Sequence, residues 1–121
     1  MEKPHKNLRA WQLGMEITVK IYLLTESFPS DEKFGLVSQM RRSAGSIPSN
    51  IAEGAGRNTQ KEFLHFLHIA RGSLSELDTH LELAMRLSFI NDSIWKETDL
   101  LLTEEDKILS GLIRNKKEEQ Q

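Results

Sequence analysis

The chain has 121 residues, of which 38% are hydrophobic and 28% charged, a balance typical of one soluble globular domain. It contains no cysteine, which excludes disulfides, thiolate zinc sites and thiol nucleophiles. The longest apolar run covers residues 21–24, far short of the roughly 20 residues that cross a bilayer. The first residues also lack the apolar core of a signal peptide, so we expect a cytoplasmic protein without a membrane segment.

The net charge of −2 does not favour a generic nucleic-acid-binding protein, but the charges are unevenly distributed along the chain. Residues 1–58 hold eight Lys and Arg against six Asp and Glu, whereas residues 59–121 hold eight against twelve. Two interpretations stay open at this point. The charges form either a solvated exterior with scattered ion pairs or a local basic surface.

The first predicted helix spans residues 8–27, with Asn7 as its N-cap and Pro29 directly after it. Its apolar residues form two stripes on nearly opposite faces. One stripe consists of Leu8, Trp11, Met15, Val19 and Tyr22. The other consists of Leu13, Ile17, Ile21, Leu24 and Phe28. Because a surface helix normally has one apolar stripe, we assign the stripe with Trp11 to the core and expect Leu13, Ile17, Ile21 and Leu24 to contact another copy of the chain.

The second predicted helix covers residues 31–53, and Ser30 is its expected N-cap. Its inner face carries large apolar residues such as Met40 and Ile47. Its outer face is small throughout and adds Ser38, Gly45 and Ser49 to the expected oligomer interface, since small side chains let a partner backbone approach. Pro48 lies inside the pattern and predicts a kink.

The third predicted helix, residues 60–88, opens with the capping box Thr59-Gln-Lys-Glu62. Asn91 and the two residues after it cap a fourth helix over residues 94–113, and the polar tail 114–121 is expected to be flexible. Four long helices joined by short connections predict an all-α, antiparallel up-down-up-down four-helix bundle that forms a single domain over residues 1–121.

Glu62 and His65 have the Glu-x-x-His spacing that di-iron bundles use on two helices. A di-iron site needs a second such motif, and the sequence has none. His65 also lies on the face of its helix opposite Phe63, away from the expected core. We therefore expect no metal site, no cofactor, no catalytic residues and no enzymatic activity.

Arg41 and Arg42 are the sharpest basic feature, and Arg57 follows where the second predicted helix ends. Guanidinium groups pair equally well with carboxylates and with phosphates. These arginines either form ion pairs, with Glu53 or with acids of another helix or copy, or form the contact surface for RNA or DNA.

The segment Phe34-Gly-Leu-Val-Ser-Gln-Met-Arg-Arg-Ser-Ala-Gly-Ser-Ile-Pro-Ser-Asn-Ile-Ala-Glu-Gly-Ala-Gly-Arg57 resembles the signature of a bacterial four-helix-bundle family encoded in intervening sequences of large-subunit ribosomal RNA genes, formerly mislabelled as ribosomal proteins. The flanking residues 21–29 and 63–77 agree with the same family. More distantly, the chain is similar to the accessory variability protein of diversity-generating retroelements, a strongly basic pentamer that binds nucleic acid and a reverse transcriptase.

The resemblance implies a bundle that assembles as a ring, a homopentamer. Three hypotheses follow from it and from the residues: an oligomeric accessory protein that binds RNA or DNA, an oligomeric scaffold that binds another protein, and a metal-dependent bundle enzyme. The third is disfavoured by the missing second Glu-x-x-His motif.

Overall fold

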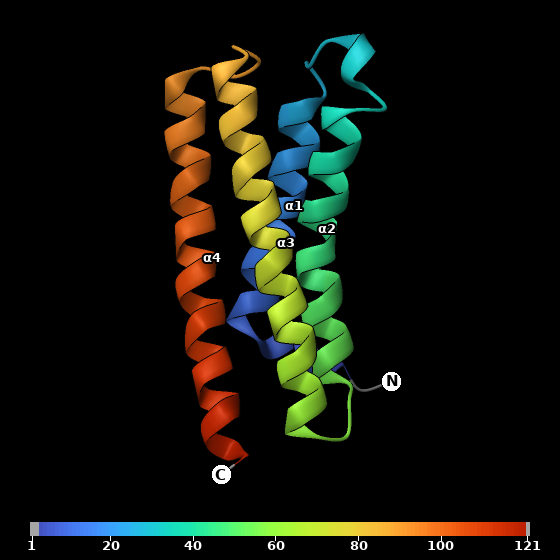
Figure 1. Ribbon diagram of the computed structural model, residues 1–121, viewed down its shortest axis with the longest axis vertical. Helices are drawn as coiled ribbons and strands as arrows, with labels where there is room; N and C mark the ends of the chain where they lie inside the picture. The colour runs from blue at the N-terminus through green and yellow to red at the C-terminus, as the bar shows by residue number, and fades with distance from the viewer. Residues whose placement is uncertain (1–2, 121) are drawn as a thin grey trace.

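The computed structural model describes residues 3–120, which contain four α-helices and no strand. The helices are α1 (Arg9–Thr25), α2 (Leu36–Ala55), α3 (Gln60–Arg86) and α4 (Asp92–Glu119). They lie side by side and alternate in direction, so the chain begins and ends at the same end of the bundle (Figure 1). The predicted all-α, up-down-up-down four-helix bundle is confirmed.

Side-chain caps mark the beginnings of α3 and α4. The Thr59 hydroxyl accepts a hydrogen bond from the Glu62 amide at 3.1 Å, and the Asn91 side-chain oxygen accepts one from the Ile94 amide at 2.8 Å. Each bond satisfies an amide that has no partner within the helix. The predicted caps of both helices are therefore confirmed.

The beginnings of α1 and α2 differ from the prediction. A 3₁₀ turn, η1 (Pro4–Asn7), precedes α1, and no side chain caps that helix, so Asn7 is not its N-cap. A second 3₁₀ turn, η2 (Ser30–Glu32), delays α2 by several residues. The reason lies in Glu32, whose carboxylate accepts a hydrogen bond from the Leu36 amide at 3.2 Å and so acts as a cap before the helix.

The end of α4 also differs, because the helix continues to Glu119, through most of the predicted tail 114–121. Lys116 forms an ion pair with Glu119 at 3.2 Å, and its ammonium lies 5.2 Å from the centre of the Phe63 ring on α3. These contacts give the polar segment a reason to stay helical beyond the last core residue. Gln121 lies outside the described residues.

The core lies between the helices and draws buried side chains from all four. Its fully or almost fully buried members include Ala10, Leu13, Ile17, Ile21, Met40, Ala44, Ile47, Ile51, Leu67, Ala70, Leu74, Leu77, Leu81, Ala84, Leu102, Leu109 and Ile113. The predicted inner-face residues Met40 and Ile47 of the second helix are among them. Burial of this apolar surface is the main favourable term in folding.

The prediction for the two faces of α1 was right for Leu8 and Trp11, which pack against the core, but wrong for the other residues that it assigned. Leu13, Ile17 and Ile21 are fully buried in the chain's own core, and Leu24 packs against it, whereas Met15, Val19 and Tyr22 are 41%, 54% and 47% exposed. Hydrophobicity could not decide between two stripes of five apolar residues each. The small residues beside each stripe distinguish the two faces. Ala10 and Gly14 lie beside the buried stripe, where they let the other helices approach.

A contact between α1 and α2 explains how α2 passes through Pro48. Proline has no amide hydrogen, so it cannot bond the carbonyl of Ala44 one turn earlier. The single hydroxyl proton of Thr18 on α1 is shared between that carbonyl, at 3.1 Å, and the carbonyl of Gly14, at 2.8 Å. α2 therefore remains one helix from Leu36 to Ala55, and the kink at Pro48 stays a prediction.

Gly54 lets the lower end of α2 approach α3 closely. A Cβ atom at this position would lie 2.9 Å from Phe63 Cδ1, 2.9 Å from Phe66 Cβ and 3.2 Å from the Phe63 carbonyl oxygen. The carbonyl belongs to the backbone of α3 and cannot move without moving the helix. A Cβ at Gly72, by contrast, would meet nothing within 4 Å.

We expect the same substitution at these two glycines to have opposite effects. Gly54→Ala should lower the free energy of unfolding by roughly 1–3 kcal/mol because it overpacks α2 against α3. Gly72→Ala should raise it by up to about 1 kcal/mol because alanine favours an open helical position. Urea denaturation followed by circular dichroism measures both, and a neutral Gly54→Ala would contradict the packing described for that end of the bundle.

Candidate interaction surfaces

One outward surface, the α1–α2 outer face, combines an apolar row with small residues. It is formed by Met15, Val19 and Tyr22 of α1 and by Ser38, Gly45 and Ser49 of α2. A Cβ added to Gly45 would meet nothing within 4 Å, so packing within the chain does not require glycine there. The structure thus leaves the three residues of α2 at the surface, buries those predicted on α1 (Leu24 in part) and exposes the opposite stripe of that helix.

Arg41 lies at the edge of this face and joins α2 to the end of α1. Its Nε donates to the Thr25 hydroxyl at 2.9 Å, and its Nη2 donates to the Tyr22 carbonyl at 3.2 Å. Its guanidinium also lies 4.7 Å from the centre of the Tyr22 ring. These contacts satisfy a carbonyl near the end of α1, so Arg41 has a role within the fold.

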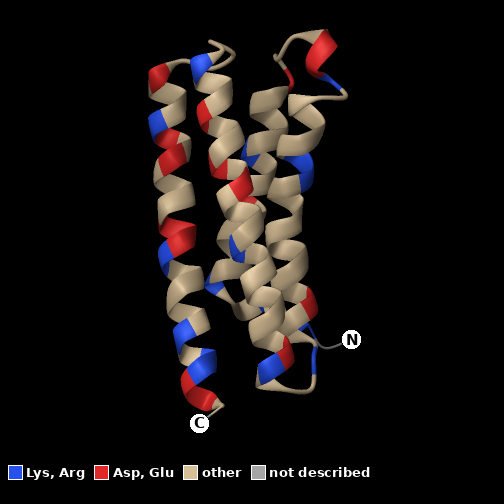
Figure 2. Ribbon diagram, viewed as in Figure 1, with Lys and Arg blue, Asp and Glu red and all other residues tan. Residues whose placement is uncertain are grey.

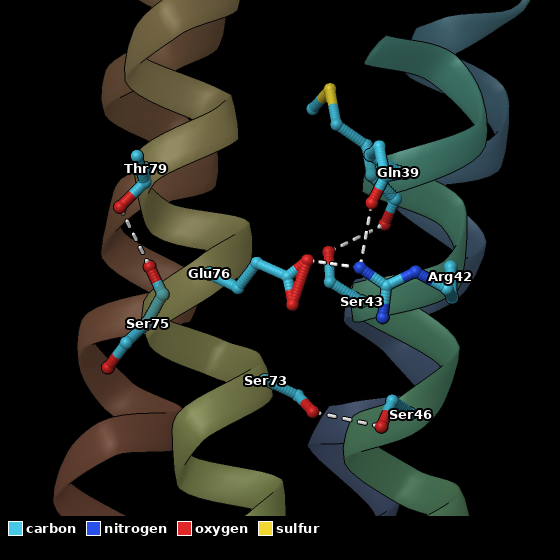
Figure 3. A network of polar contacts seen from close by, with 9 residues as sticks. Gln39, Arg42, Ser43, Ser46, Ser73, Ser75, Glu76 and Thr79 are labelled. Atoms are coloured by element: carbon cyan, nitrogen blue, oxygen red, sulfur yellow. Dashed lines mark hydrogen bonds and ion pairs between the residues drawn. The ribbon is translucent and has the colours of Figure 1, made fainter. Parts of the chain in front are cut away.

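Arg42 points the other way, toward α3. It forms an ion pair with Glu76 and donates to the Gln39 side-chain oxygen at 2.8 Å (Figure 3). One turn further along, the hydroxyl groups of Ser73 and Ser46 are hydrogen-bonded at 2.9 Å (Figure 3). Arg42 therefore belongs to a row of polar contacts that joins α2 and α3.

Arg57 lies just beyond the opposite end of α2, and the helix between Arg42 and Ala55 is about 20 Å long. It forms an ion pair with Glu53, and its guanidinium lies 4.9 Å from the centre of the Phe66 ring. The structure does not bring Arg41, Arg42 and Arg57 together, because the first two point to different neighbouring helices and the third is two to three turns beyond the middle of the bundle. The predicted joint surface of these arginines is therefore not formed within one chain.

A different charge pattern becomes visible once the helices are folded side by side. Gly14, Pro48 and Glu105 lie at one level, and Ser46 and Ser73 lie close to it, so this level divides the bundle into two halves. The lower half in Figure 2, residues 3–14, 48–72 and 107–120, holds ten Lys and Arg against four Asp and Glu. The upper half, residues 15–47 and 73–106, holds six against thirteen. The bundle is basic at the end of its termini and acidic at the other.

The groove between α3 and α4 shows this separation most clearly. Burial is the largest cause that lowers the pKa of His68 in the lower half. The positive charges of Lys117, Arg71 and His65 lower it further. Burial is also the largest cause that raises the pKa of Asp78 in the upper half. The negative charges of Asp99, Glu82 and Asp106 raise it further. Positive charges therefore affect His68 in the lower half, and negative charges affect Asp78 in the upper half.

Glu105 on α4 is a carboxyl group inside the core. Its side chain is fully buried, neither oxygen has a hydrogen-bond partner, and Oε2 lies 3.0 Å from where a Cβ of Gly14 would be. Burial raises the pKa of Glu105 to about 8, and the nearby Arg9, which lowers it, bonds Glu104 at 3.2 Å instead. The side chain is therefore a neutral acid at neutral pH.

Residues 3–120 contain neither a cluster of metal-binding side chains nor a membrane-spanning helix. Among residues 3–120, no three His, Asp or Glu side chains come close enough together to hold a metal ion. His65, from the Glu-x-x-His motif, is exposed and packs edge-on against Phe66, with 5.2 Å between the ring centres. Over the same residues, none of the helices combines the length and the hydrophobicity that crossing a bilayer requires.

Comparison with known proteins gives a family match and a structural match. The family described as 23S rRNA-intervening sequence protein matches residues 6–111. The chain is also similar to a crystal structure of a protein of unknown function from the S23 ribosomal protein family of Bacteroides thetaiotaomicron, with 26% identity and a TM-score of 0.78. That alignment covers 86% of this chain and 97% of the other. No curated protein matches the sequence.

Replacing Glu105 with glutamine should change how stability depends on pH. The carboxyl group is protonated in the folded chain up to about pH 8 but loses its proton near pH 4.5 when unfolded. The folded state therefore holds an additional proton between these values, and the unfolding free energy falls as the pH rises through this window. Glu105→Gln should be close to wild type at pH 4 and more stable by roughly 2–4 kcal/mol at pH 9.

Glu104→Gln is the matched control, because Glu104 is the exposed neighbour on the same helix. Denaturant titrations at several pH values should give this variant the wild-type pH dependence, apart from a small change for the lost contact with Arg9. If Glu105→Gln followed the wild-type pH dependence as well, Glu105 would be ionised in the folded chain and the account of its burial would be incorrect.

Proposed function

The chain belongs to the 23S rRNA-intervening sequence protein family, and from that premise we propose that it is a non-enzymatic accessory protein that works as a homo-oligomer and binds RNA or DNA. The observation that carries the proposal is the α1–α2 outer face, where an apolar row remains in solvent after the core is complete. Such a row on a small bundle is typical of a surface that meets a partner.

A second copy of the chain fits the α1–α2 outer face because its two helices complement each other. α1 offers the bulky Met15, Val19 and Tyr22, and α2 offers the small Ser38, Gly45 and Ser49. If the row on α1 of one copy packs against the small residues on α2 of the next, the contact joins two different surfaces. Contacts of this kind close into a ring when the rotation allows it. We expect five copies in the ring, as the family resemblance implies.

The proposed nucleic-acid binding rests on charge. The net charge is −2, yet the lower half of the bundle has six more basic than acidic residues. A ring of parallel copies would repeat this basic end around one rim, so that weak phosphate contacts add up through multivalency.

The alternative function is an oligomeric scaffold that binds another protein without nucleic acid. The acidic upper half of the bundle is the surface that favours this alternative, since it would attract a basic protein (Figure 2). The two functions differ in their ligand. Electrophoretic titration of labelled RNA and DNA at increasing salt tests them, because phosphate contacts weaken steeply with salt. If neither nucleic acid binds the wild-type oligomer at low salt, the nucleic-acid function is wrong and the scaffold remains.

Val19→Glu should dissociate the oligomer. The substitution places a charge in the middle of the exposed row of α1, where a neighbouring copy would have to bury it. Light scattering of the wild type at micromolar concentration should give five times 13.9 kDa, and the variant should give 13.9 kDa with unchanged helical content.

Leu100→Glu provides the matched control, because Leu100 is 71% exposed on α4, away from the α1–α2 outer face. It adds the same charge and should leave the assembly intact. A monomeric wild type, or dissociation by both variants alike, would rule out the α1–α2 outer face as the contact between copies.

A further inference from the structure

Phe34, in the loop before α2, is the most exposed large hydrophobic side chain of the described residues, with 89% of its surface in solvent. The loop is nevertheless held by hydrogen bonds. The Glu32 carbonyl accepts one from the Gly35 amide at 3.1 Å, and the Glu32 carboxylate accepts one from the Leu36 amide at 3.2 Å. A large aromatic ring on an ordered loop is typical of an anchor that fills a pocket of a partner. We call residues 30–35 the Phe34 loop.

An apolar groove lies at the same end of the bundle, between the end of α1 and the beginning of α4. We call it the α1–α4 groove. Its volume is about 360 Å³, and it is lined by the apolar Leu23, Leu24, Phe89, Ile90 and Ile94 and by the polar Lys20, Ser27 and Glu97. Since a cavity of about 150 Å³ holds a benzene ring, one phenylalanine ring fits the groove.

The Phe34 ring of the same chain does not fill this groove. The Phe34 loop lies at the upper right of Figure 1, and α4 begins at the upper left, on the opposite side of the bundle. The loop and the groove are therefore at one level but on different sides. In a ring of parallel copies, one side of a chain meets a different side of the next chain at the same level. Such an arrangement can bring the loop of one copy to the groove of its neighbour.

The α1–α4 groove continues the α1–α2 outer face. Met15, Val19 and Leu23 follow one another at intervals of four residues, so these exposed side chains form one row on α1 that ends in the groove. On α2, the Phe34 loop lies directly before the small residues of the outer face, four residues from Ser38. A neighbour that places the small residues of its α2 against this row would therefore place its Phe34 loop at the groove.

A cation beside the ring favours the same occupant. The Lys33 ammonium lies 5.5 Å from the centre of the Phe34 ring and forms no ion pair within residues 3–120. The α1–α4 groove contains the carboxylate of Glu97, one oxygen of which accepts a hydrogen bond from α1 at 2.6 Å. The loop also carries Asp31 and Glu32, so the attraction to Glu97 is local to Lys33 and does not come from net charge.

We infer that Phe34 of one copy inserts into the α1–α4 groove of the next copy and anchors the contact between them. The inference rests on the proposed homo-oligomer and adds a second contact beside the α1–α2 outer face. Insertion would remove the ring from water and place it near Phe89, which already packs on Phe28 with 5.3 Å between the ring centres. Each chain offers one ring and one groove, so every groove is filled only in a closed ring of copies.

Phe34→Ala should weaken the assembly without changing the fold, because the side chain is almost entirely in solvent within one chain. Light scattering over a dilution series should show that the concentration at which half of the oligomer dissociates rises at least about tenfold, as expected for the loss of a buried phenylalanine ring. Leu100→Ala is the matched control, since Leu100 is also exposed but lies outside both surfaces. It should stay within about twofold of wild type, and circular dichroism should show wild-type helical content for both variants.

Cross-linking tests which surfaces meet, and the chain has no cysteine of its own to interfere. The double variant Lys33→Cys/Ile94→Cys keeps the Phe34 ring and places one thiol beside it and one in the groove. A short bismaleimide cross-linker should convert it into a ladder on a denaturing gel, in which each step adds one chain of 13.9 kDa. Each single variant alone, and the control Lys33→Cys/Leu100→Cys, should give no ladder.

The Phe34 contact and the homo-oligomer can fail separately. If the wild type is an oligomer but Phe34→Ala dissociates within about twofold of it and Lys33→Cys/Ile94→Cys gives no ladder, the Phe34 contact is wrong and the α1–α2 outer face remains. If Lys33→Cys alone gives covalent dimers, two Phe34 loops meet each other and insertion into the groove is wrong as well. If the wild type is a monomer, the proposed homo-oligomer and the Phe34 contact fail together.

Discussion

The orientation of α1 in the bundle combines burial of its apolar side with a hydrogen bond from the Thr18 hydroxyl to the Ala44 carbonyl. Pro48 leaves that carbonyl without its helical donor, and an unsatisfied buried carbonyl costs roughly 1–3 kcal/mol. Thr18 reaches it in an orientation of α1 that turns the Leu13, Ile17 and Ile21 side inward. The same rotation brings Gly14 against Glu105 and leaves Met15, Val19 and Tyr22 in solvent. The α1–α2 outer face is thus a consequence of the rotation of α1 that brings Thr18 to the Ala44 carbonyl of α2.

Local signals in the sequence predicted most of the fold. The four helices, the caps at Thr59 and Asn91 and the inner face of α2 depend on neighbours within a few residues, which a sequence pattern contains. The orientation of α1 depends on Ala44 and Pro48, which lie on another helix. The sequence prediction placed Glu32 in the first turn of the second helix. In the structure Glu32 lies before α2 and its carboxylate caps the Leu36 amide, so the helix begins later. These differences arise where the decisive partner is distant or where an acid has two possible roles.

The interaction surfaces were harder to predict, because they depend on which residues the folded chain brings to one level. Along the sequence, the charges divide weakly into a basic first part and an acidic second part. Antiparallel folding places the beginnings of α1 and α3 beside the ends of α2 and α4. The charges, which are only weakly divided along the sequence, are therefore strongly divided between the two ends of the bundle (Figure 2). Arg41 and Arg42 are neighbours in sequence, which suggested one joint surface. In the fold, each completes a different contact between helices.

The separation of charge between the two ends makes each chain an electric dipole along its long axis. Parallel copies in a ring would place like ends side by side, so electrostatic repulsion opposes the proposed assembly and apolar contact has to overcome it. Salt screens that repulsion and favours the ring, while it weakens the hold on a polyanion. A strand bound across the basic ends neutralises the same repulsion. Assembly and strand binding would therefore support each other even though salt affects them in opposite directions.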